Sequence, residues 1–251
     1  MKAKIIASGS KGNCTFLLCD HKNFIIDIGI SYLSLQKSLE RNSLSLEDFE
    51  GVLITHSHSD HIKGLTSIIN YTNLKILIPT PMYQELKERI PIERCLFIED
   101  NNDFDEVNIE LIHTSHDTEC SVGYIVSHKN KKLVYVTDTG YINRKYLSKM
   151  MNSDIYIIES NHDEEMLMDG PYPYFIKQRV VGDSGHLSNK VTSKYLKKLV
   201  SDNTKYIVLA HISEKNNTEE LAYRETVDRL GDTQIEIIIA KQDEESMLLE
   251  V

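Results

Sequence analysis

The chain has 251 residues, of which 41% are hydrophobic and 26% are charged, as is usual for a globular protein. Its formal net charge of −10 argues against a general nucleic-acid-coating surface, because neutralising phosphates needs clustered Lys and Arg. A local basic groove, or bound cations that supply positive charge at one site, remains compatible with this balance.

Short runs rich in Ile, Val, Leu, Tyr and Phe predict strands at residues 4–7, 16–18, 24–27, 51–55, 75–78, 107–112, 122–126, 132–137, 154–159, 205–209 and 235–239. Helical periodicity predicts helices at residues 31–39, 61–71, 81–89, 143–150, 188–200 and 218–229. Pro81 suits an early helical position, and Ser188 is a plausible N-cap. The acidic stretch 99–106 predicts a solvated loop. Strands in the middle with helices early and late suggest two sheets flanked by helices.

The organisation of the chain favours one domain over residues 1–251, because it has only 5 Pro and no Ser/Gly-rich linker. Residues 1–9 hold too short an apolar run for a signal peptide. No segment approaches the roughly 20 apolar residues that span a bilayer. The 4 cysteines form no CxxC pair. We therefore expect a cytoplasmic protein with reduced cysteines and no membrane segment.

Four potential metal ligands lie within six residues where the predicted strand 51–55 ends, in the segment His56-Ser57-His58-Ser59-Asp60-His61. His56 and His58 are two residues apart, so an extended chain points both rings to the same side. Asp60 and His61 lie where the chain turns into the next predicted helix. The alternative is an exposed His-rich turn that binds metal only adventitiously. The HxHxDH spacing favours a metal site over that alternative.

Further ligand candidates follow three other predicted strands. His116, with Asp117 beside it, comes after strand 107–112, Asp138 after strand 132–137, and His211 after strand 205–209. A single His or Asp at a strand end is more often a turn or cap residue. Three of them, together with HxHxDH, favour loops that converge on one site.

Several motifs in this order resemble the YycJ/WalJ/VicX family of the metallo-β-lactamase superfamily. They span nearly the whole chain and are Ser8-Gly9-Ser10-Lys11-Gly12-Asn13, the HxHxDH segment, Thr137-Asp138-Thr139-Gly140, Glu159-Ser160-Asn161-His162-Asp163, Gly185-His186-Leu187-Ser188-Asn189 and Ala210-His211-Ile212-Ser213 with Asn216-Asn217. One departure is Ser57, where many members carry Glu between the first two histidines. That position is not a ligand, so the departure concerns the surroundings of the metal ligands and not metal binding itself.

The resemblance implies a four-layer αββα sandwich with two divalent metal ions. It assigns one ion to His56, His58 and His116, the other to Asp60, His61 and His211, and a bridging role to Asp138. Nitrogen and carboxylate ligands without a thiolate suit Zn²⁺ or Mn²⁺. By the same resemblance, Asp27 would accept a hydrogen bond from a ligand histidine, although a simple turn carboxylate is the alternative.

The catalytic candidates are Asp60 and His186. The resemblance implies that His186 lies over the scissile phosphate, where an imidazolium can stabilise charge or protonate the leaving oxygen. Its alternative is a helix-entry residue beside the predicted cap. Two ions about 3.5–4 Å apart can lower the pKa of a bridging water towards ~7 and clamp the oxygens under attack.

Substrate-binding candidates lie outside the metal ligands. The loop with Ser10 and Asn13 could bring backbone amides to an anion, although a tight hairpin explains it nearly as well. His162 and Ser188 are further candidates from the family motifs. The aromatic stretch 172–175 with Lys177 and Arg179 could stack on unpaired bases and meet phosphates. An ordinary loop and helix packed on the core is the alternative there.

The leading functional hypothesis is a 5′-to-3′ exonuclease on single-stranded DNA, which the resemblance implies. Residues 139–210, between Asp138 and His211, are too few for the long inserted domain of the β-CASP nucleases. A thioester, lactone or cyclic-nucleotide hydrolase of the same fold is the second hypothesis. A non-catalytic, metal-binding regulatory protein is the third. A β-lactamase is least expected, because no export signal is visible.

Overall fold

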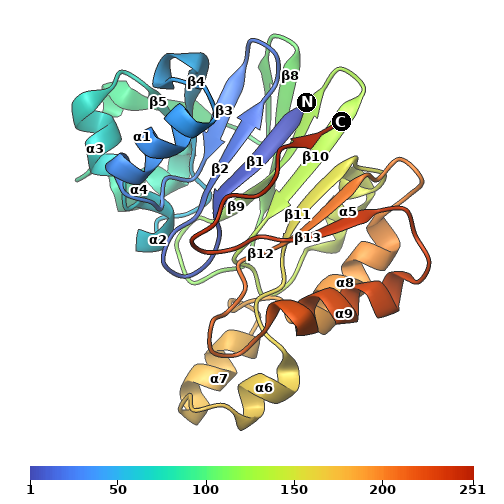
Figure 1. The fold of residues 1–251 in the computed structure, drawn as a ribbon. Helices are drawn as coiled ribbons and strands as arrows, with labels where there is room; N and C mark the ends of the chain where they lie inside the picture. Colours follow the sequence, from blue (N-terminus) through green and yellow to red (C-terminus); the bar gives the residue numbers. More distant parts are fainter.

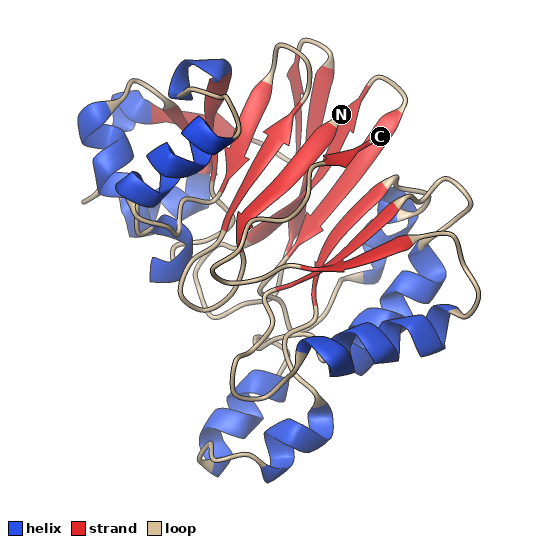
Figure 2. Ribbon diagram, viewed as in Figure 1, coloured by secondary structure: helices blue, strands red, loops and turns tan.

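The computed structural model describes residues 1–251 and contains two seven-stranded sheets between layers of helices (Figures 1 and 2). The first sheet comprises β1 (Lys2–Ala7), β2 (Cys14–Leu18), β3 (Asn23–Ile26), β4 (Phe49–Leu53), β5 (Lys75–Pro79), β6 (Cys95–Ile98) and β14 (Leu249–Glu250) in the order β14-β1-β2-β3-β4-β5-β6. The second comprises β7 (Asn101–Phe104), β8 (Val107–His113), β9 (Val122–His128), β10 (Lys131–Val136), β11 (Ile155–Glu159), β12 (Tyr206–Ala210) and β13 (Glu236–Ile239) in the order β13-β12-β11-β10-β9-β8-β7.

Helices gather outside the two sheets and in one projection. Beside the first sheet lie α1 (Tyr32–Arg41), α2 (Ser59–Ile62), α3 (Leu65–Tyr71) and α4 (Tyr83–Leu86). Beside the second lie α5 (Arg144–Met150), α8 (Asn189–Leu199) and α9 (Glu219–Leu230). We call α6 (Glu164–Asp169) and α7 (Tyr174–Val181) the projection, because they extend from the lower end of the sandwich in Figure 1. Short 3₁₀ turns occupy Leu46–Asp48, Thr80–Met82 and Ile92–Arg94.

The layers follow from the period-two alternation of strand side chains. In β10, Leu133 and Tyr135 join a core cluster of 44 residues that includes side chains from both sheets. Val134 and Val136 instead join a cluster of 16 residues that includes side chains of α5, α8 and α9. Because both faces of this strand are covered, it is apolar on both sides. This is the αββα sandwich that the sequence predicted.

Parallel pairing brings the functional strand ends to one edge of the sandwich. The pairs β3–β4, β4–β5, β10–β11 and β11–β12 are all parallel. Asp27 and His211 directly follow β3 and β12, Asp138 lies two residues after the end of β10, and the three have left-handed φ values of 58°, 53° and 53°, respectively. Non-glycine residues seldom adopt this conformation, and strain of this kind concentrates at functional sites.

Every predicted strand and helix has a counterpart, but several elements differ from the prediction. The predicted helix 61–71 divides into α2 and α3 at Gly64, whose amide donates to Ile28 O at 2.7 Å. A Cβ at Gly64 would stand 2.6 Å from Ile30 O, so close packing of this backbone explains the division. The predicted helix 81–89 is shorter, because a 3₁₀ turn precedes α4.

The acidic stretch 99–106 contains a strand, so the prediction of a simple loop was wrong. Within it, β7 pairs antiparallel with β8 at the edge of the second sheet. Edge strands commonly carry charged side chains, which stay in water while the backbone pairs. Strands β6 and β14 and helix α6 lay outside the predicted elements, and a helix near α7 was only the alternative interpretation of that stretch. None of the helices has the length and apolar character that crossing a membrane would require.

Candidate metal centre

The HxHxDH segment lies just after β4, and Asp27 fixes Thr55, the residue before its first histidine. The Thr55 amide donates to Asp27 Oδ1 and the Thr55 hydroxyl donates to Asp27 Oδ2, both at 2.8 Å. His58 is the N-cap of α2, and Asp60 and His61 lie within that helix. Both the backbone and the side chain of Thr55 are therefore held in place immediately before the first histidine.

Side chains from both sheets converge at this point. The seven predicted ligands form three overlapping groups in which the nitrogen and oxygen atoms lie within 4.8 Å of one another: His56 with His58 and His116, His56 with His61 and Asp138, and Asp60 with His61 and His211. Asp138 is central, with Oδ2 3.2 Å from His61 Nε2 and Oδ1 3.9 Å from His116 Nε2. The fold thus brings together all seven residues that the sequence suggested.

Each histidine ring turns one nitrogen towards a fixed oxygen and the other into the cluster. His61 Nδ1 donates to Asp27 Oδ2 at 2.7 Å. His56 Nδ1 lies 3.1 Å from the Thr55 hydroxyl, and His116 Nδ1 lies 3.3 Å from Gly185 O. These contacts turn Nε2 of all three rings towards the centre, where His56 Nε2 has no hydrogen-bond partner and His116 Nε2 lies 3.2 Å from His58 Nδ1.

The outer nitrogens of the remaining two rings, those of His211 and His58, face carboxylates. The sequence analysis had not identified these carboxylates as orienting groups. His211 Nδ1 donates to Glu159 Oε1 at 3.0 Å. His58 is the reverse of the others, because its Nε2 lies 3.3 Å from Asp117 Oδ1 and its Nδ1 faces His116 Nε2 at 3.2 Å. An acceptor for one ring nitrogen sets which nitrogen is available to a metal.

Three buried polar atoms in this cluster have no hydrogen-bond partner, namely His56 Nε2, His211 Nε2 and Asp138 Oδ2. A buried polar group without a partner costs about 1–3 kcal/mol, so three in one place call for a shared partner. A divalent cation supplies one, because imidazole nitrogen and carboxylate oxygen are both ligands of such ions. The residues present therefore fit the metal ions that the fold family implies.

Charge compensation links the buried carboxylates to the histidines. Burial lowers the pKa of His61, but Asp27 and Asp138 outweigh it and raise that pKa to about 10. Burial also opposes ionisation of Asp138, yet His211 and His61 hold its pKa well below the ordinary value. His56 differs, because burial takes its pKa well below the usual range. Protons thus offset the carboxylates here, and metal binding would have to displace them.

Glu159 opens one of the family motifs, but the sequence analysis gave it no role in the site. It is fully buried and accepts from His186 Nδ1 at 2.7 Å and His211 Nδ1 at 3.0 Å. Burial opposes its ionisation, but His186 and His211 lower the pKa of Glu159 to about 2. The available signal was that Glu159 ends β11, the strand between those that lead to Asp138 and His211.

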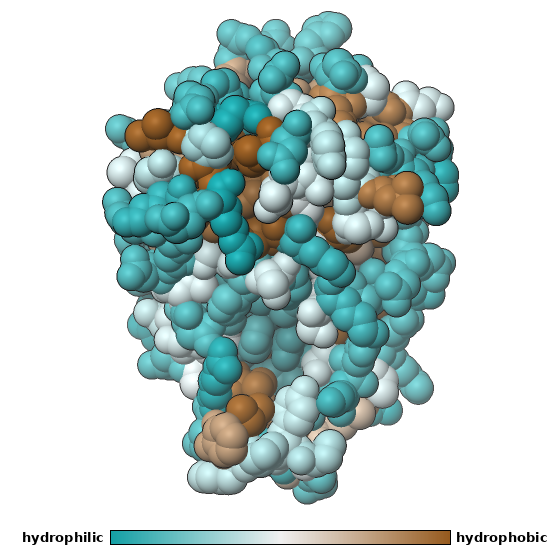
Figure 3. Space-filling model, turned by 90° about the vertical axis from the view of Figure 1, so that its left-hand side faces the viewer, coloured by the Kyte–Doolittle hydropathy of each residue, from teal (hydrophilic) through white to brown (hydrophobic).

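The site opens into a cleft of about 310 Å³. Its lining includes the predicted residues Ser10, His186 and Arg179, together with Tyr172 and Ile176, whose involvement had not been predicted individually. Arg179 pairs with Asp117 across the mouth of the cleft. On the projection, Tyr174 and Phe175 are 74% and 70% exposed. Figure 3 shows that hydrophobic groups reach the surface in this lower part of the molecule.

Four predicted substrate contacts lie outside the cleft lining. Asn13 is fully buried, and its Nδ2 lies 2.9 Å from His61 Nε2, so it faces the metal cluster from inside the protein and does not line the cleft. The Ser188 hydroxyl accepts from Val191 N and caps α8, which confirms the predicted N-cap. His162 is buried, which lowers its pKa to about 4. Lys177 donates to Met168 O within the projection.

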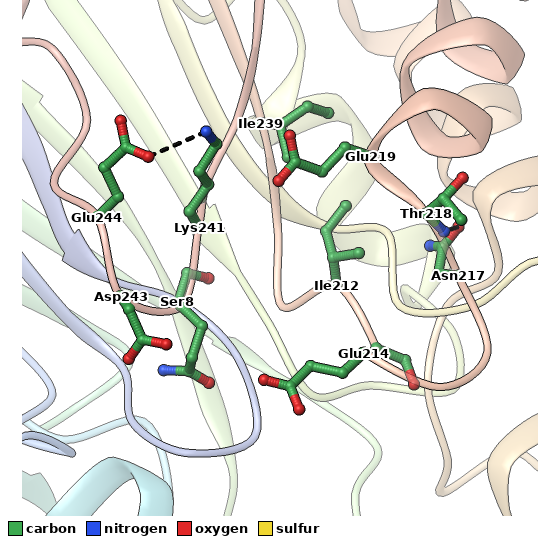
Figure 4. Close-up of a pocket in the computed structure, with 13 residues that line it drawn as sticks. Ser8, Ile212, Glu214, Asn217, Thr218, Glu219, Ile239, Lys241, Asp243 and Glu244 are labelled. Carbon is green, nitrogen blue, oxygen red and sulfur yellow. Dashed lines mark hydrogen bonds and ion pairs between the residues drawn. The ribbon is translucent and has the colours of Figure 1, made fainter.

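A larger cavity, of about 450 Å³, adjoins the back of the centre (Figure 4). Its lining comes from residues 212–219 and 239–244 together with Ser8, whose hydroxyl accepts from His211 N at 2.9 Å. None of the seven predicted ligand side chains lines it. The chemistry therefore belongs to the smaller cleft.

Comparison with known proteins agrees with this geometry. Residues 22–212 match the model of a β-lactamase superfamily domain. The chain is 33% identical to exodeoxyribonuclease YycJ of Bacillus anthracis, over 87% of this chain and 84% of that one. It is 32% identical to exodeoxyribonuclease WalJ of Streptococcus pneumoniae, over 92% and 88%. The metallo-β-lactamase-fold protein YhfI of Bacillus subtilis is alike in fold alone, with 15% identity, 98% coverage of both chains and a TM-score of 0.74.

Proposed function

The chain belongs to the metallo-β-lactamase superfamily and, within it, to the family of the YycJ and WalJ exodeoxyribonucleases, and from this premise we propose that it degrades single-stranded DNA from the 5′ end with two divalent metal ions. It is a metal-dependent hydrolase of that fold. The observation that carries the proposal is the set of five histidine rings, each oriented by an outer oxygen, around Asp138.

The ligand sets proposed for the two ions follow the groups of side chains whose nitrogen and oxygen atoms lie close together. His56, His58 and His116 would hold one ion, Asp60, His61 and His211 the other, and Asp138 lies between the two groups. When bound, a pair of Zn²⁺ or Mn²⁺ ions supplies positive charge that activates water and neutralises the oxygens of the attacked phosphate. The net charge of −10 makes such a local source of positive charge important for an anionic substrate.

The protein's own contribution to proton transfer centres on His186. Its Nδ1 donates to Glu159 Oε1 at 2.7 Å, and the side chain lines the cleft. With one ring nitrogen held in this way, Nε2 is the atom available to donate a proton to the leaving 3′ oxygen. Asp60, which also lines the cleft, has Oδ2 3.6 Å from both His61 Nε2 and His211 Nε2.

The preference for an unpaired strand is supported by the composition of the cleft mouth. Tyr172 and Arg179 line it, and Tyr174 and Phe175 expose their rings nearby on α7. Aromatic faces stack on unpaired bases with about 1–3 kcal/mol per base, and duplex bases are not free to do so. Ser10 at the opposite loop completes the set of substrate contacts that we retain.

The test is a panel of metals against substrates. Purified protein receives Zn²⁺, Mn²⁺ or Mg²⁺ with 5′-phosphorylated single-stranded DNA labelled at either end, the same sequence as duplex, RNA, a cyclic nucleotide and a thioester. We expect mononucleotides to leave from the 5′ end of the single strand in the presence of Zn²⁺ or Mn²⁺. The His58→Ala variant should lose this activity, because it removes a proposed ligand.

The outcomes separate the levels of the proposal. Intact DNA with every metal, together with turnover of the thioester or cyclic nucleotide, would replace the nuclease with a small-molecule hydrolase. Release from the 3′ end would overturn only the proposed polarity. Full activity of His58→Ala would contradict the metal site itself. Stoichiometric metal binding without hydrolysis of any substrate would favour a regulatory protein.

A further inference from the structure

Helix α7 lies at the mouth of the cleft without a buried face. None of its residues is buried, although Ile176, Arg179 and Val180 line the cleft. Helices in proteins normally depend on burying an amphipathic face for most of their stability. Specific polar contacts must therefore matter more for the position of α7 than for the other helices of the chain.

The polar contact from the side chains of α7 to the sandwich runs through Arg179. Its guanidinium donates to Asp117 Oδ2, in the loop that follows β8. The other hydrogen-bonded α7 side chain, Lys177, donates to Met168 O and stays within the projection. At the helix end, the His186 amide donates to Val180 O at 2.9 Å. The Arg179–Asp117 ion pair is thus the side-chain link between this wall and the metal cluster.

The second oxygen of Asp117 faces the histidines. Oδ1 lies 3.3 Å from His58 Nε2 and 3.4 Å from His116 Nε2. The side chain of His58 is 36% exposed, whereas that of His116 is 4% exposed. Packing therefore restrains the His58 ring less, and Asp117 is the acceptor that faces its outer nitrogen. One carboxylate consequently contacts a proposed metal ligand with one oxygen and the cleft wall with the other.

We propose that Asp117 is a positioning residue that couples the orientation of His58 to the position of α7. The inference rests on the proposed metal binding but not on the identity of the nucleic acid. Asp117 also holds Arg179 at the cleft, where it is the one Lys or Arg among the lining residues. A substrate phosphate would then meet a guanidinium that is already held in place, which lowers the entropic cost of binding.

The test measures metal affinity and the exposure of α7 separately, in protein stripped of metal. Zn²⁺ is titrated by competition with a chromophoric chelator into wild type, Asp117→Asn and Arg179→Gln. We expect Asp117→Asn to weaken binding of one ion by about 10–100-fold, as loss of a carboxylate that orients a ligand histidine does. Arg179→Gln should weaken Zn²⁺ binding less than Asp117→Asn does, because Asp117 keeps its contact with His58 but loses the ion pair that fixes its own position.

Hydrogen–deuterium exchange of residues 174–181 supplies the second readout. Exchange should be faster in both variants, while Arg179→Lys, which can keep the ion pair, should stay close to wild type. Asp183→Asn is the matched control, because it removes an exposed carboxylate near α7 that has no ion pair. Circular dichroism and thermal unfolding establish that the variants are folded.

Wild-type Zn²⁺ affinity in Asp117→Asn, or unchanged exchange of α7 in both Asp117→Asn and Arg179→Gln, would overturn the inference. These measurements need no nucleotide. If they succeed while DNA remains intact with every metal, the coupling stands and only the proposed substrate fails. If wild type binds no Zn²⁺, the metal site and the inference both fail.

Discussion

The cleft has one side made of buried residues and one made of exposed residues. On the buried side, Asp27, His61 and Asp138 are no more than 2% exposed. Both carboxylates contact the His61 ring. On the exposed side, α7 has no buried residue, and Arg179 provides its ion pair to the sandwich. Local stability follows burial and contact density, so the two sides should differ in rigidity.

This contrast suits a polymer-degrading hydrolase. Groups that hold metal ions must keep their geometry to within about 0.5 Å, which needs packing and outer hydrogen bonds. A wall that contacts a long, variable strand benefits instead from exposed aromatic faces and an adaptable position. The predictions below test this division of labour, beginning with the largest expected effect.

Loss of the central carboxylate should abolish catalysis. Asp138→Ala removes the side chain that lies between the two proposed ligand groups. We expect kcat/KM on single-stranded DNA to fall by on the order of 1,000-fold, equivalent to about 4 kcal/mol of transition-state stabilisation. Metal content per chain and steady-state rates measure it. A variant with near-wild-type rates and metal content would place the reaction elsewhere in the molecule.

The buried side should carry far more of the folding stability. Ile54→Ala, at a fully buried position two residues before His56, should cost about 2–5 kcal/mol in the free energy of unfolding. Val181→Ala, at an α7 position that is 41% exposed, should change it by about 0.5 kcal/mol or less. Urea unfolding of the metal-free proteins compares them. Similar costs at the two positions would contradict the contrast.

Glu159→Gln should weaken metal binding although it leaves all seven proposed metal ligands unchanged. The carboxylate accepts from His211, from His186 and from the Leu187 amide, and a neutral amide cannot accept at both of its atoms. We expect a loss of about 10–100-fold in metal affinity. Glu165→Gln on α6 is the control, because that side chain has no hydrogen bond or ion pair. Equal affinities in the two variants would remove Glu159 from its orienting role.

The smallest expected effect concerns binding on the exposed side. Phe175→Ala should raise KM for single-stranded DNA by about 5-fold, at the low end of base-stacking energies, and leave kcat unchanged. Tyr71→Ala serves as control, since Tyr71 is equally exposed, at 71%, but lies at the end of α3. Steady-state kinetics distinguishes them. A fall in kcat, or an equal effect of Tyr71→Ala, would argue against stacking on α7.

Local spacing was enough to predict most of the strands and the ligand-bearing segment, although it missed β6, β7 and β14. The strand that ends at Val136 could be predicted because both of its faces are buried, which makes its sequence a continuous apolar run. Ser188 could be predicted as an N-cap because capping involves residues within four positions of each other. The ligands His56, His58 and His61 are close in sequence as well as in space. Such features depend on neighbours along the chain, so the sequence alone indicates them.

The orienting carboxylates depend on contacts that no local pattern contains. Glu159 meets His211 across 52 residues, and Asp117 meets Arg179 across 62. Asn13 likewise resembled a substrate contact but lies buried against His61, 48 residues away. The sequence by itself determined which residues could bind metal and which apolar runs would form the inner strands of the sheets, but not β6, β7 and β14. Only the tertiary structure decided which oxygen orients each ring and which wall stays exposed, because both follow from how distant strand ends pack together.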